Sequence, residues 1–85
     1  MRITYDPEGD ALYIELRRVQ AHDSVDVEEG VTADLDENGH IIGLEVLDAS
    51  DRLTPEELSS IHYENLLLAE EPDDAELASK ASNTR

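Results

Sequence analysis

The sequence contains no cysteine, no tryptophan and no phenylalanine, and its aromatic residues are three tyrosines. The absence of cysteine excludes a disulfide framework, a zinc ribbon, an iron–sulfur cluster and a thiol nucleophile, and it favours the reducing cytoplasm as the compartment. With so few aromatic rings, any core has to be built mainly from aliphatic side chains. A chain of 85 residues has room for one small domain.

Basic residues are also scarce. Lys and Arg together number 6 against 22 Asp and Glu, which gives a formal net charge of -16. Proteins that bind nucleic acid directly need clustered basic side chains against the phosphates, so direct DNA or RNA binding is not expected. No run approaches the roughly 18 apolar residues of a membrane span, and the amino terminus lacks the apolar stretch of a signal peptide. We therefore expect a soluble, cytoplasmic protein with no membrane contact, and a basic partner suits its charge.

The first half of the chain alternates apolar and polar residues, which is typical of strands with one buried face. The alternation covers residues 3–5, 12–16, 25–27, 31–35 and 41–47. Turn-forming residues separate these segments, and Asn38-Gly39 is a strong hairpin signal. The pattern predicts a small antiparallel meander sheet of about five or six strands.

A short C-terminal helix is predicted after the strands. Thr54 suits the N-cap, Pro55 the first helical position, and Glu57 completes a capping box. Residues 61–68 either continue this helix or form a closing strand, and their β-branched and aromatic residues favour the strand.

Apolar periodicity fades from residue 70 onward. We predict one compact α+β, mainly β, domain over residues 1–69, followed by an acidic, disordered tail over 70–85. A domain of this size buries only about 60% of the surface that its unfolded chain exposes, so we expect a homo-oligomer, most simply a dimer. The leucines expected either in that interface or in the core are Leu66, Leu67 and Leu68.

Residues 34–45 match the template of a calcium-binding loop. The residues at ligand positions are Asp34, Asp36, Asn38 and Glu45. An EF-hand needs a helix on each side of the loop, whereas the alternation predicts strands there. The preferred interpretation is a hairpin that turns at residues 36–39, with Asp34 roughly opposite Glu45. A weak calcium-binding hairpin is the alternative.

No catalytic or cofactor motif is present in the sequence. His22, His40 and His62 follow no zinc-ligand spacing, no serine lies in a G-x-S-x-G elbow, and the glycines form no phosphate-binding loop. Asp48 and Ser50 are expected to cap backbone amides between the last strand and the helix. We expect no enzyme activity, no cofactor and no metal requirement.

Two ordered motifs carry a family resemblance. They are YDPEGDALYI over residues 5–14 and DxDxxGxxxGLEVLDAS over residues 34–50. With them, roughly residues 1–53 resemble the small bacterial domain-of-unknown-function 2283 family, although Gly9 and Leu44 stand where alanine and isoleucine are common. The resemblance implies a compact antiparallel β-rich fold, and it assigns the aspartates and glycine of the calcium-like loop to the family's hairpin.

The same resemblance implies a partner. Members of that family are often encoded beside small RelE-like, ribonuclease-like toxins, which implies a protein-binding, antitoxin-like role. An acidic protein with open strand edges could cover the RNA-binding face of a small basic toxin by charge and by strand addition. The alternatives are an acidic self-assembling domain of another role and the weak calcium-binding hairpin at residues 34–45.

Overall fold

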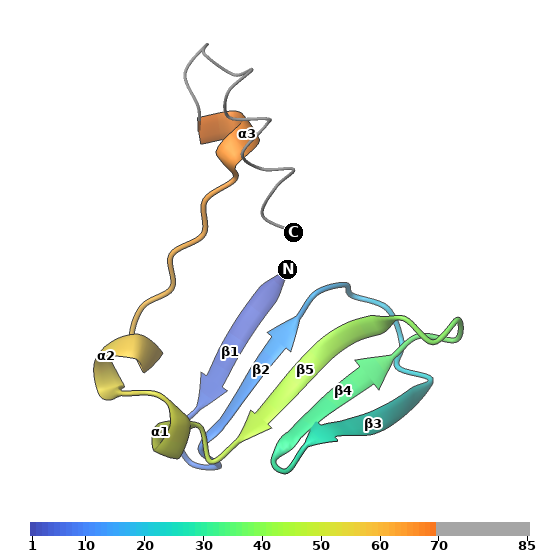
Figure 1. Ribbon diagram of the computed structural model, residues 1–85, viewed down its shortest axis with the longest axis horizontal. Helices are drawn as coiled ribbons and strands as arrows, with labels where there is room; N and C mark the ends of the chain where they lie inside the picture. The colour runs from blue at the N-terminus through green and yellow to red at the C-terminus, as the bar shows by residue number, and fades with distance from the viewer. Residues whose placement is uncertain (70–85) are drawn as a thin grey trace.

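The computed structural model shows one antiparallel sheet of five strands, followed by short helical turns (Figure 1). The strands are β1 (Arg2–Asp6), β2 (Ala11–Glu15), β3 (Asp23–Glu28), β4 (Val31–Leu35) and β5 (Ile41–Leu47). The helices are α1 (Ala49–Arg52), α2 (Pro55–Leu58) and α3 (Leu66–Ala69). The predicted mainly β, antiparallel fold is confirmed. The structure describes residues 1–69, so the predicted tail lies outside the described residues.

The strand order in the sheet is β1-β2-β5-β4-β3. β3, β4 and β5 form a meander, and β5 pairs with β2 of the β1–β2 hairpin. The linker over residues 16–22 therefore carries the chain from β2, which neighbours one edge strand, to β3 at the opposite edge, as Figure 1 shows. This order brings the two sequence motifs together, because β2 belongs to the first and β5 to the second.

One face of the sheet is apolar. Paired residues of neighbouring strands share a face, and the register aligns aliphatic side chains across all five strands. The residues that we call the apolar face are Ile3, Tyr5, Leu12, Ile14, Val25, Val31, Ala33, Ile42, Leu44 and Val46. Of these, Ala33 and Ile42 are buried, and no large side chain among the described residues is fully buried. The core is therefore one thin layer.

α2 covers one corner of the apolar face. The predicted capping box is confirmed: the Glu57 amide donates to Thr54 Oγ1 at 3.1 Å, and the Thr54 amide donates to the Glu57 carboxylate at 2.8 Å. Leu53 and Leu58 flank this turn, and with β1 and β2 they line a groove of about 310 Å³. Half-burial of these two leucines fixes the helical turn against the sheet.

The segment after α2 is extended and exposed. Residues 60–65 form no strand, so the closing strand favoured for residues 61–68 is wrong, and a helical turn, α3, begins at Leu66 instead. Asn65 Oδ1 accepts a hydrogen bond from the Leu67 amide at 3.0 Å at the start of that turn. The strand prediction failed because alternation shows only which side chains share a face. A strand also needs a neighbouring strand to pair with, and the described chain offers none here. Figure 1 shows this segment running away from the sheet.

Candidate functional site

The face opposite the apolar face carries carboxylates. The register places acidic side chains from all five strands on this face. The residues that we call the acidic face are Asp6, Glu15, Asp26, Asp34 and Glu45. Arg2 lies on the same face in the row of Glu15. Like charges on neighbouring strands repel one another, so this face gains from the approach of a cationic surface.

Tyr13 and Asp34 form the central polar contact of the acidic face. The Tyr13 hydroxyl donates to Asp34 Oδ2 at 2.7 Å, across the intervening strand β5. This hydrogen bond, together with partial burial and the charges of Asp34, Glu15 and Glu45, raises the pKa of Tyr13 to about 12. The neutral phenol therefore holds the Asp34 carboxylate in place at physiological pH.

Gly43 makes the Tyr13 contact possible. It pairs with Glu15 on one side and Asp34 on the other, directly below the path of the Tyr13 ring. A Cβ at Gly43 would lie 2.7 Å from Tyr13 Cζ and 3.3 Å from the Ile14 carbonyl oxygen. The glycine of the second motif is thus required for close approach of the tyrosine of the first.

A second polar cluster joins the β1–β2 turn to α1. Asp10 Oδ1 accepts from the Tyr5 hydroxyl at 2.7 Å and from the Ser50 amide at 3.0 Å, while Oδ2 accepts from Ser50 Oγ at 2.7 Å. The Asp10 carbonyl also accepts from the Ala49 amide at 3.0 Å. The hydrogen bonds from Tyr5 and then Ser50 lower the pKa of Asp10.

This cluster corrects the expectation for residues 48–51. Asp48 adopts a left-handed backbone with φ of 53° and makes no side-chain capping bond to α1. The first amides of α1 bind Asp10 instead, and the Ser50 hydroxyl binds the same carboxylate. A short-range capping rule could not identify a cap supplied from 40 residues away.

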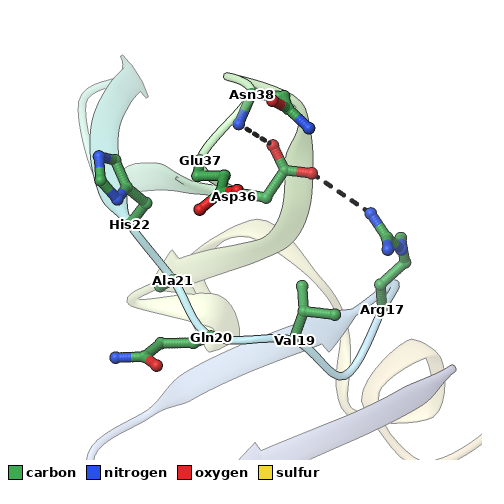
Figure 2. A pocket seen from close by; sticks show the side chains of 8 residues that line it. All are labelled: Arg17, Val19, Gln20, Ala21, His22, Asp36, Glu37 and Asn38. Carbon is green, nitrogen blue, oxygen red and sulfur yellow. Dashed lines mark hydrogen bonds and ion pairs between the residues drawn. The ribbon is translucent and has the colours of Figure 1, made fainter.

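The β4–β5 turn is held by Asp36. Its Oδ1 accepts from the amides of Asn38 and His40, each at 2.9 Å, and its Oδ2 lies 3.3 Å from Arg17 Nη1. These contacts, the His40 amide first, lower the pKa of Asp36. Figure 2 shows this carboxylate beside a polar hollow of about 490 Å³ between the β4–β5 turn and the linker 16–22. Asp36 therefore accepts hydrogen bonds from the amides of the turn, and its contact with Arg17 holds the linker beside the turn.

The structure does not gather the residues of the calcium-like loop. Asp34 binds Tyr13 and pairs with Gly43, whereas Glu45 pairs with Thr32, so the expected opposition of Asp34 and Glu45 is wrong. The hairpin turn itself is confirmed, since the Gly39 amide donates to the Asp36 carbonyl at 3.0 Å. Within residues 1–69, no group of three or more His, Asp or Glu side chains is arranged to hold a metal ion.

The histidines lie in three separate parts of the fold. His22 belongs to the linker before β3, His40 ends the β4–β5 turn, and His62 follows α2, where its Nε2 lies 3.4 Å from Glu64 Oε1. Ser50 has its hydroxyl committed to Asp10. The structure therefore brings none of these histidines to the Ser50 hydroxyl.

The leucines suggested for an interface lie in α3. Leu66 and Leu67 are exposed, so in a single chain they do not belong to the core; Leu68 lies in the same turn, and its side chain is outside the described residues. Exposure leaves the interface expectation for Leu66 and Leu67 open. Among the described residues, no helix has the length and apolar character that a membrane crossing requires.

These features define a class of small, single-layered antiparallel β domain, with faces of opposite chemistry and polar clusters that tie its turns together. The chain belongs to the family described as protein of unknown function (DUF2283), which it matches over residues 2–50. The match spans all five strands and ends at Ser50, and it confirms the resemblance seen in the two motifs. No curated protein and no solved structure matches the chain.

Two residues of the polar clusters escaped the sequence analysis. The sequence pattern places Asp10 between two predicted strands and Tyr13 within the second of them, and it assigns a partner to neither. The signal for Asp10 was present, because an aspartate after a glycine in a tight turn can adopt the positive φ of 53° seen here. The partner of Tyr13 required the strand order, which places β5 between β2 and β4.

Proposed function

We propose that this chain is a non-catalytic protein-binding module that acts as an antitoxin-like partner and neutralises a small, basic, ribonuclease-like protein in the cytoplasm. The observation that carries the proposal is the gathering of carboxylates from every strand onto one face of a single-layered sheet. A protein that cleaves RNA needs a cationic surface for phosphate. The acidic face presents carboxylates to such a surface in a fixed array, and complementary charge favours fast and selective association.

The open edges of the sheet support the same proposal. β1 and β3 are the outer strands, and every residue of β3 is exposed. An outer strand can accept a strand of another protein through its free backbone groups. On β3, Asp26 lies on the acidic face beside that edge. A basic strand added to β3 would therefore gain backbone hydrogen bonds and ion pairs together.

The first experiment identifies the partner and measures its affinity. The tagged chain is used to capture proteins from an extract of its source cells at low salt, the bound protein is identified by mass spectrometry, and the purified pair is titrated by calorimetry. We expect one small basic protein at one-to-one stoichiometry, with an affinity that falls as salt screens the charges. Recovery of the chain alone would contradict the proposal.

A pair of variants matched in charge tests the site. The acidic-face variant combines Glu15→Gln, Asp26→Asn and Glu45→Gln, which keep side-chain size and leave the Tyr13–Asp34 bond intact. The control variant combines the exposed substitutions Glu8→Gln, Glu37→Gln and Glu56→Gln. We expect the acidic-face variant to lose at least about tenfold in affinity and the control variant to lose less than about threefold, because rim charges contribute little. Equal losses would show that net charge, rather than this face, attracts the partner.

A further inference from the structure

Within the described residues 1–69, the helices cover only part of the apolar face. Leu53 and Leu58, which flank α2, share a groove with β1 and β2. By contrast, Val25 on β3 is 45% exposed, and Leu44 on the central strand is only half-buried. The segment 61–67 adds a second uncovered apolar surface, in which Tyr63 and Leu67 are 71% and 78% exposed. The two surfaces meet at Ile61, which lines the same groove as Leu53 and Leu58, and from there the segment leads away from the sheet (Figure 1).

The distribution of charge favours another copy of this chain as the occupant. Two chains of net charge -16 repel, so they can associate only where their carboxylates point away from the contact. Stacking the apolar faces turns the five carboxylates of each acidic face outward, since packed sheets lie about 10 Å apart. Two further acids, Asp23 and Glu28, lie on the apolar side, but both are on the edge strand β3, and Glu28 is paired with Arg52 at 2.6 Å. Pairing along β3 does not meet the condition, because β3 carries Asp23, Asp26 and Glu28 and would place like charges opposite one another.

The available area explains why the segment belongs to the same interface. Five strands at about 4.8 Å spacing and five residues at about 3.3 Å each give a face of roughly 24 by 17 Å. That is about half of the roughly 800 Å² per partner found in standard interfaces. The exposed apolar side chains of the segment 61–67 supply additional area that continues from the groove at Ile61.

We propose that two copies of this chain associate through their apolar faces, with the segment 61–67 of each copy packed along the rim of the contact. The acidic faces and the β3 edges remain open in this dimer. The dimer can therefore form without the basic partner, and each copy keeps its acidic face and its β3 edge free to bind one.

The test measures the mass and the dissociation constant of the full chain by sedimentation equilibrium over a wide range of concentrations. We expect a species of about 19 kDa, twice the 9.5 kDa of one chain. Val25→Glu on the apolar face raises the dimer dissociation constant by about tenfold or more. The matched control, Leu47→Glu, is on the opposite face with a similar exposure of 42% and leaves the constant within about threefold.

A second variant changes no residue of the sheet, so its effect does not depend on whether the sheet folds with a buried charge. Tyr63→Ser combined with Leu67→Ser changes only exposed side chains, and we expect it to weaken the dimer while circular dichroism stays unchanged. A mass of 9.5 kDa at every concentration would overturn the proposal, as would equal effects of Val25→Glu and Leu47→Glu. Unchanged association of the segment variant would remove residues 61–67 from the interface. Two controls separate the dimer from the proposed function. Val25→Glu should still bind the basic partner, and the acidic-face variant should still dimerise.

Discussion

Asp10 and Ser50 are joined by two hydrogen bonds although 40 residues separate them, with Ser50 Oγ 2.7 Å from Oδ2 and the Ser50 amide 3.0 Å from Oδ1. Asp10 ends the β1–β2 turn, and Ser50 begins α1 directly after β5. The contact therefore closes the end of the sheet where β2 and β5 pair. It also gives a physical reason for the occurrence of both motifs in one chain.

Removing the Ser50 hydroxyl tests the strength of this closure. We expect Ser50→Ala to lower the free energy of unfolding by about 1 kcal/mol, because one charge-assisted hydrogen bond is lost while the amide bond remains. Urea denaturation of the variant and of the exposed-serine control Ser60→Ala measures the difference. Equal stability of the two variants would show that the contact has no energetic weight.

The same cluster predicts the titration of Asp10. Donors from Tyr5 and Ser50 hold the pKa of Asp10 below its ordinary value of 3.8. A depressed folded-state pKa means that the stabilisation is present above the unfolded value and is lost as pH falls through the folded value. Carboxyl NMR shifts should place the Asp10 titration below 3.8, and Ser50→Ala should move it upward. A wild-type value at or above 3.8 would contradict the cluster.

Gly43 should tolerate no side chain while Tyr13 is present. Gly43→Ala forces the ring away and breaks its bond to Asp34, so we expect a loss of about 1 to 3 kcal/mol in stability. In a Tyr13→Ala background the ring is absent, and the added methyl group should cost less. A double-mutant cycle measures the coupling, and additive effects of Gly43→Ala and Tyr13→Ala would contradict the contact.

Tyr13 should also titrate late on the alkaline side. Its pKa is about 12 against an ordinary 10.0 because the neutral hydroxyl donates to Asp34. A raised folded-state value means that the stabilisation is complete below pH 10 and is lost as pH rises through about 12. The difference between wild-type and Tyr13→Phe absorbance titrations isolates this group. A difference transition near 10 would show that the hydrogen bond does not form in solution.

Local patterns predicted the strands, the Asn38-Gly39 turn and the capping box of Thr54 because each depends on residues close in sequence. The period of two also separates the two faces once the strands are paired. The period of two does not predict the order of the strands. That order places β5 between β2 and β4, so that Tyr13 reaches Asp34 across Gly43. For the same reason, alternation alone suggested a strand over residues 61–68, although the described chain offers that segment no neighbour.

The calcium-like loop illustrates the difference between a motif and its setting. Asp34, Asp36 and Glu45 have the spacing of ligands in the sequence, but a strand sends alternate side chains to opposite faces and a turn redirects Asp36 to its own amides. The register then places Asp34 and Glu45 in different rows of the acidic face. The sequence motif therefore named two carboxylates of the acidic face, Asp34 and Glu45, and only the strand register places them on that face.

Neutralisation itself is the most direct test of the account. Growth of cells that express the captured basic protein is measured with co-expression of the wild-type chain, the acidic-face variant or the control variant Glu8→Gln, Glu37→Gln, Glu56→Gln. The account predicts that wild type and control restore growth and that the acidic-face variant does not. Growth that is unaffected by the wild-type chain, or restored equally by all three chains, would contradict it.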